Sequence, residues 1–185
     1  MKISLLTLFL GAVAPALSGA TLTFSPLNTE VVPGGGFEFV IQLSGVTDPM
    51  MVQDNVGAFQ ILGEASQSGV VFGLVDLNSS FVTGGGTNSV GAESFQISAI
   101  AVSVPVVGPI VEIGRVSGTV SSAALNGTMF SVQPIFPSTF FADGTTFTPI
   151  TIDSFEGASF NVVPEPTALS LLLCGLGLLV RRSRE

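Results

Sequence analysis

The stretch Phe37-Glu38-Phe39-Val40-Ile41-Gln42-Leu43-Ser44 decides the fold class of this chain. Large apolar residues occupy every second position from Phe37 to Leu43, which is the spacing of a β-strand that buries one face. About nine segments have this alternation or a strand-like composition, and no segment between them shows a convincing helical period. The predicted strands are Thr21–Phe24, Phe37–Ser44, Ala58–Leu62, Val70–Val75, Ser94–Val104, Ile110–Ser121, Thr128–Val132, Phe147–Ile152 and Ala158–Val162.

Turn residues separate these strands. They include Pro33–Gly36, Gly84–Gly86, Asn126-Gly127 and Asp143-Gly144, all of which tolerate positive φ. Short strands with frequent turns predict an all-β fold, a single antiparallel β-sandwich of jelly-roll or immunoglobulin-like type over residues 21–162. Within Ser94–Val104, the later residues are apolar on both faces, which is the pattern of a central strand.

The N-terminus has the composition of a signal peptide. Lys2 supplies the positive region, Ile3–Val13 form the apolar region, and Ser18-Gly19-Ala20 place small residues where a signal peptidase cleaves. We expect residues 1–20 to be removed after Ala20, with cleavage after Ser18 as the alternative. An uncleaved N-terminal membrane helix is disfavoured by the short apolar region.

The C-terminus, residues 163–185, has three parts. Pro164 and Pro166 flank Glu165 and prevent a helix from running back into the body. The uncharged segment Ala168–Val180 would span roughly 20 Å as a helix, against about 30 Å of hydrocarbon. Arg181, Arg182 and Arg184 follow and would stay on the cytoplasmic side. An ordinary tail anchor and a buried core helix are the alternatives.

This tripartite tail resembles the PEP-CTERM sorting signal of Gram-negative bacteria. The resemblance implies export, transient anchoring in the inner membrane, and recognition by an exosortase that cuts at or near Pro164-Glu165-Pro166. It also implies that Arg181, Arg182 and Arg184 act as the stop signal. The final location would be the cell surface or the extracellular space of a producer of exopolysaccharide.

Composition excludes several classes of function. The body has one cation, Arg115, and eleven carboxylates, a net charge of −10, so nucleic-acid binding is excluded. It has no histidine, lysine or cysteine, since Cys174 lies in the tail, so hydrolytic triads and the usual zinc and haem sites are excluded. We expect Arg115 to pair with a neighbouring carboxylate.

Carboxylate chemistry is what remains. Calcium accepts oxygen ligands from loops, and the candidate ligands are Asp76 with Asn78, and Asp48 with Asp54. Solvated turn residues are the plain alternative, and we expect no cofactor. A carboxylate-based glycosidase is a further alternative, but no pair of acids stands out and Trp and Tyr are absent.

The early body has a second resemblance. The segments Ala20–Pro26, Gly36–Ile41 and Val56–Ile61 look like the opening of cohesin-like and carbohydrate-binding-module-like sandwiches. The leading hypothesis is therefore a non-enzymatic surface or matrix protein that associates with exopolysaccharide in a biofilm. The alternative is a cohesin-like module that binds a partner protein through one sheet face.

Overall fold

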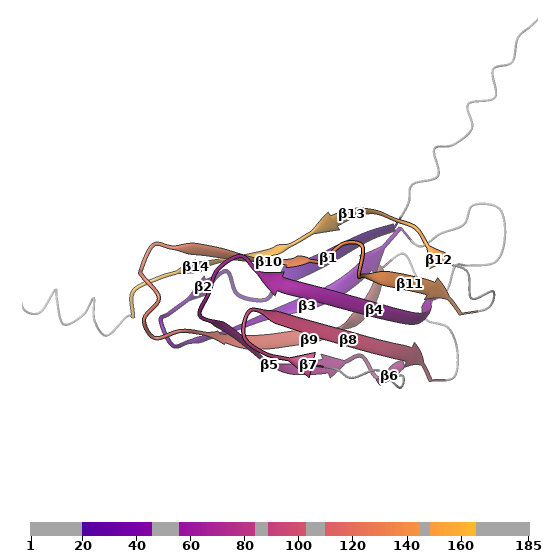
Figure 1. The fold of residues 1–185 in the computed structure, drawn as a ribbon, viewed down its shortest axis with the longest axis horizontal. Coiled ribbons are helices and arrows are strands. Elements are labelled where there is room, and N and C mark those ends of the chain that lie inside the picture. Colours follow the sequence, from indigo (N-terminus) through magenta and orange to yellow (C-terminus); the bar gives the residue numbers. More distant parts are fainter. Residues whose placement is uncertain (1–19, 46–55, 84–88, 103–109, 145–148, 166–185) are drawn as a thin grey trace, which may run out of the picture.

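In the computed structural model, two β-sheets pack face to face. The structure describes residues 20–45, 56–83, 89–102, 110–144 and 149–165, and these residues form strands and turns without a helix. The strands run along the long axis of the molecule (Figure 1). The predicted all-β sandwich is confirmed for this part of the chain.

The smaller sheet has five strands in the order β13-β1-β3-β9-β5. The predicted strand at 37–44 is β3, which pairs with β1 and β9 on its two edges. The bounds are β1 (Ala20–Pro26), β3 (Gly36–Ser44), β5 (Val70–Leu77), β9 (Ile110–Val120) and β13 (Ile152–Glu156).

The larger sheet has nine strands and is centred on β4 (Val56–Ala65). One edge of β4 pairs with β8, and the other pairs first with β11 and then with β10. The remaining bounds are β2 (Glu30–Val31), β6 (Phe81–Thr83), β7 (Ser89–Val90), β8 (Ser94–Ala101), β10 (Met129–Pro134), β11 (Phe140–Asp143), β12 (Pro149–Ile150) and β14 (Ala158–Val162).

Two features of the sheets differ from the prediction. The sandwich is not wholly antiparallel, because β13 pairs in parallel with β1 and β2 pairs in parallel with β14. The strand predicted at Phe147–Ile152 is instead β12 and the start of β13, and residues 145–148 lie outside the described part. Both differences have the same cause. The direction and the limits of these strands depend on pairing with strands far away in the sequence, and the local alternation of apolar residues carries no information about that pairing.

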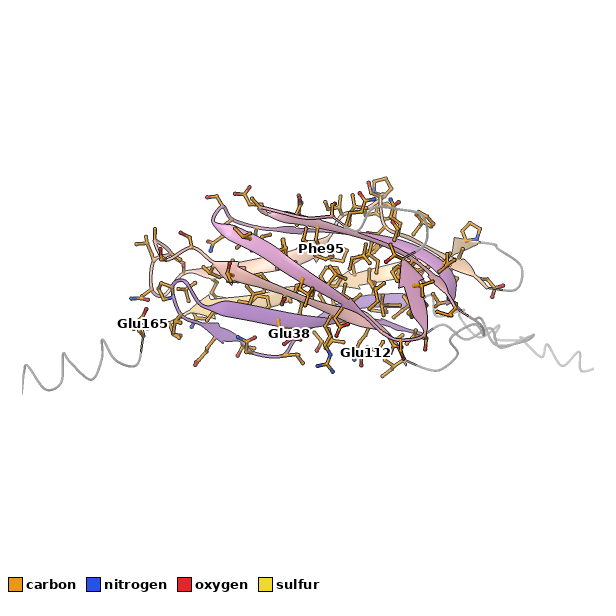
Figure 2. The ribbon with its side chains drawn as sticks, turned by 90° about the horizontal axis from the view of Figure 1, so that it is seen from below. Glu38, Phe95, Glu112 and Glu165 are labelled. Carbon is orange, nitrogen blue, oxygen red and sulfur yellow. The ribbon has the colours of Figure 1, made fainter. Side chains whose placement is uncertain are left out.

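Phenylalanine side chains fill the space between the sheets. Phe37 contacts the rings of Phe39, Phe72, Phe130 and Phe160 at centroid separations of 5.1 to 6.5 Å. Figure 2 labels Phe95, which is 2% exposed, and Glu38 and Glu112, which are partly exposed. Offset and edge-to-face ring contacts add about 0.5–1.5 kcal/mol each beyond burial, so this cluster holds both sheets together.

Glu93 is one of the residues that link the two sheets along one side, together with its neighbours Gly91 and Ala92. Its N–H donates to the carbonyl of Val70 in the smaller sheet at 2.9 Å, and its carbonyl accepts from the N–H of Ala65 in the larger sheet at 2.8 Å. Its φ is 67°, a left-handed conformation that costs a non-glycine residue roughly 1–2 kcal/mol.

Replacing Glu93 with glycine should therefore stabilise the protein. Relief of the left-handed strain exceeds the entropy that glycine loses on folding, for a net gain of about 0.5–1 kcal/mol. Urea denaturation measures the change. The matched control is Glu64→Gly in the regular part of β4, which should lower the free energy of unfolding; equal destabilisation by both variants would contradict the role of the φ angle.

The position of Arg115 gives a second prediction. Its backbone lies in β9, paired with β3 on one edge and β5 on the other, so the native body should resist trypsin although this is its only basic residue. After trypsin treatment of the native protein, the intact mass of the body should show that only terminal residues have been lost. After denaturation, one further cut should follow Arg115. Fragments ending at Arg115 from native protein would show that β9 opens locally.

Candidate functional site

One end of the larger sheet presents apolar side chains on its outer surface. Residues of β4, β8 and β11 alternate, so that Phe59, Phe95 and Phe141 point into the core. The opposite side chains form a row across four strands, because Ala58 pairs with Ala142 and Ile100, and Ile100 pairs with Val82. At about 4.8 Å between strands, the row is roughly 14 Å long. Together with Phe140, these residues, Ala58, Val82, Ile100 and Ala142, are called the apolar face.

The apolar face contains a shallow depression of about 230 Å³. Ala58 forms its floor, since its side chain is short, while Phe140 and Ile100 form the walls and Gln60 and Ser98 the adjoining polar edge. Phe140 is 50% exposed and Ile100 is 47% exposed. The depression is large enough to accept an aliphatic side chain supplied by a partner, the kind of central anchor that dominates protein interfaces.

The loop between β10 and β11 sets the position of Phe140. Leu62 in β4 bonds to this loop instead of to a strand: its carbonyl accepts the N–H of Ile135 at 2.8 Å. Its N–H donates to the hydroxyl of Thr139 at 3.2 Å, and Thr139 is 5% exposed. Gln60 adds a bond from its amide to the carbonyl of Ser138 at 3.2 Å. The hydroxyl of Thr139 also donates to the carbonyl of Leu62 at 3.3 Å. Four hydrogen bonds thus fix the loop on β4 and place Phe140 beside the depression.

The outer surface of the smaller sheet is different in kind. Its side chains are mostly hydroxyls and carboxylates that bond to one another across strands. The hydroxyl oxygens of Thr21 and Ser154 lie 2.7 Å apart, and the hydroxyl of Thr23 donates to the carboxylate of Glu156 at 3.3 Å. The predicted pairing of Arg115 is confirmed, with Glu112 at 3.6 Å, and both side chains are about half exposed, so the pair adds little stability. The smaller sheet also exposes apolar side chains, namely Val71, Leu74 and Ile110, but each of them pairs with a serine or threonine on the neighbouring strand. The larger sheet differs because its exposed apolar side chains pair with one another.

Of the predicted calcium ligands, the structure describes Asp76 and Asn78. Asp76 lies on β5, where it is exposed and pairs with Arg115 of β9. The side-chain oxygen of Asn78 accepts the N–H of Ser80 at 3.0 Å. Asp48 and Asp54 lie outside the described residues. Within the described ranges, no group of three acidic, histidine or cysteine side chains could hold a metal ion.

The predicted processing residues lie at the limits of the described chain. Ala20 is the first residue of β1, is 3% exposed, and donates its N–H to Thr151 at 3.2 Å. Pro164 and Glu165 follow β14 and are exposed. Ser18, Pro166, Arg181, Arg182 and Arg184 lie outside the described residues, as does the apolar tail segment. In the described part, no helix is long and apolar enough to cross a membrane.

Sequence reasoning missed the apolar face. The apolar character of Ile100 and Val102 indicated a central strand, and β8 does lie between β4 and the two short strands β6 and β7. However, Ile100 and Val102 are 47% and 53% exposed. The signal that could have found the site is this same strand, because its apolar residues on both faces fit an exposed apolar surface as well as a central position.

The fold is similar to that of cohesin modules. Solved structures that match include the sixth cohesin of scaffoldin B from Acetivibrio cellulolyticus, in complex with a dockerin, with a TM-score of 0.59, 16% identity, and coverage of 78% of this chain and 99% of that chain. A cohesin module of a family 33 glycoside hydrolase from Clostridium perfringens has a TM-score of 0.60 and 13% identity, covering 80% and 97%. A non-cellulosomal cohesin from Archaeoglobus fulgidus has a TM-score of 0.59 and 12% identity, covering 83% and 97%. No family model matches the sequence, and no curated protein matches it.

Replacing Thr139 with valine should release the β10–β11 loop. The substitution keeps the shape of the side chain but leaves the N–H of Leu62 without its acceptor, which should lower the free energy of unfolding by about 1 kcal/mol. Thermal unfolding and hydrogen exchange at Leu62 measure the effect. Thr139→Ser keeps the hydroxyl and is the control; identical exchange at Leu62 in both variants would contradict the assignment.

Proposed function

We propose that this chain is a non-enzymatic module that binds a partner protein through the apolar face. The observation that carries the proposal is a row of exposed apolar side chains that pair with one another across four strands, with a depression among them, on a body of high negative charge. Interfaces of this kind have an apolar centre and a polar rim, and here Glu64 and Gln60 lie on the same side of β4 as Ala58. The cohesin-like fold supports this function, since similar solved structures include complexes of a cohesin with a dockerin.

The charge of the body indicates the chemistry of the partner. Two copies carry −10 each between residues 21 and 163, so their like charges oppose self-association. A partner that inserts an aliphatic side chain between Phe140 and Ile100, and that carries Lys or Arg around it, complements both the shape and the charge. Its binding should weaken as salt is added.

Export through the terminal signals is part of this proposal. Val163 is still bonded to the sheet, with its N–H 2.9 Å from the carbonyl of Val31, and exposed Pro164 and Glu165 follow immediately. An exosortase could therefore reach the sorting signal after the body has folded. The module would then act at the cell surface, in contact with exopolysaccharide and with other surface proteins.

Paired substitutions test the proposed face. The immobilised protein and two variants, Ile100→Asp and Leu74→Asp, are incubated with an extract of the outer surface of the producing cells. Leu74 is 63% exposed on the outer side of the smaller sheet, so it is a matched site for an added carboxylate. One protein should be captured by the wild type and by Leu74→Asp but lost by at least tenfold with Ile100→Asp. Equal capture by all three, or enrichment of glycan alone, would contradict protein recognition through this face.

A further inference from the structure

A second concavity lies at the other end of the sandwich. It has a volume of about 400 Å³ and lies between the β4–β5 turn and the segment joining β9 to β10. The N–H of Gly127 donates to Val162 at 2.7 Å, so this hollow adjoins the end of β14. Figure 1 shows β6, β11 and the end of β8 at the opposite end of the long axis. The hollow is therefore separate from the apolar face.

Backbone hydrogen bonds hold the walls of the hollow in place. The N–H of Ser121 donates to Gly69 at 2.7 Å, which joins the two segments directly. The turn before β5 is fixed by Ser66, whose N–H donates to Ser131 at 2.8 Å and whose hydroxyl accepts the N–H of Ser131 at 2.9 Å. A site formed in advance loses little conformational entropy when a ligand binds.

The polar groups of the hollow are neutral, and they offer a ligand both a hydrogen-bond donor and a hydrogen-bond acceptor. The hydroxyl of Ser121 accepts the N–H of Ala123 at 3.1 Å, so its proton is available to a ligand. The hydroxyl of Thr128 donates to the carbonyl of Leu125 at 2.6 Å, so its lone pairs are available. Gln67 offers both an amide donor and a carbonyl acceptor. No side chain that lines the hollow is charged.

We propose that this hollow binds an uncharged sugar residue. A vicinal diol donates one hydrogen bond and accepts another, which matches the pair formed by Thr128 and Ser121. Leu125, 72% exposed, offers an apolar contact for the C–H groups of a pyranose ring. The neutral lining and the acidic body disfavour phosphates and uronic acids, which would meet no cation there.

The expected affinity for a single sugar is low. The hollow has no aromatic ring on which a sugar could stack, so a dissociation constant of about 1 mM is expected. A polymer with repeated units, bound by many copies of the protein on one surface, would be held far more tightly through multivalency. The inference does not depend on the apolar face.

Titration of the isotope-labelled protein with glucose, galactose, mannose and N-acetylglucosamine tests this inference by NMR. At least one sugar should shift the amide signals of Ser68, Ser121 and Thr128, and glucuronic acid should not. Thr128→Val should weaken binding about tenfold, which corresponds to the loss of one hydrogen bond. Gln67→Ala, whose side chain fixes no described turn, is a second variant in case Thr128→Val perturbs the segment.

Thr119→Val, an exposed threonine on the outer side of the smaller sheet, is the control and should leave the shifts unchanged. The inference is overturned if no neutral sugar shifts these signals. It is also overturned if both hollow variants bind as the wild type does, or if the shifted signals belong to the apolar face instead.

Discussion

The packing of phenylalanine rings between the sheets is the constraint on which the rest of the structure depends. Rings from β1 and β3 meet rings from β8, β10 and β14, as in the contacts of Phe24 with Phe95 at 5.9 Å and of Phe37 with Phe130 at 5.4 Å. The rings require small neighbours. A Cβ on Gly118 would come within 2.5 Å of the Phe37 ring, and one on Gly63 would overlap the ring of Phe95. Because the body has no disulfide, these contacts fix which face of every long strand is turned inward.

The side chains on the outer surfaces of the two sheets do not take part in this packing, so the two surfaces can differ in composition. A binding site can form on one of them without disturbing the core. The smaller sheet bonds its outer side chains to one another, as Thr21 does with Ser154. The larger sheet leaves the side chains of Ile100 and Phe140 about half exposed and holds Phe140 in place through Thr139. A surface that is apolar, positioned by its own hydrogen bonds and carried on an acidic body suits recognition of another macromolecule better than catalysis.

The long strands could be predicted from the sequence, and the short ones could not. Alternation located β3 and β9 closely, because each carries enough inward apolar residues to report its period. The two-residue strands β2, β7 and β12 have no period to read, and β11 follows a loop whose attachment depends on Thr139 meeting Leu62, 77 residues away in sequence. The apolar face was missed for a related reason. The sequence shows that Ile100 is apolar, but only the packing of the whole chain shows that nothing in the described part covers it.

The direction of the terminal strands has a mechanical consequence. β1 begins at one end of the long axis and β14 finishes at the other, and each has a parallel neighbour, β13 and β2 respectively (Figure 1). Tension applied between Ala20 and Val162 would pull β1 toward one end of the molecule and β13, through β14, toward the other. The hydrogen bonds between β1 and β13 would then be loaded together in shear, and they would not break one at a time. Shear spreads the load over the whole ladder. A body built in this way should withstand pulling along its length.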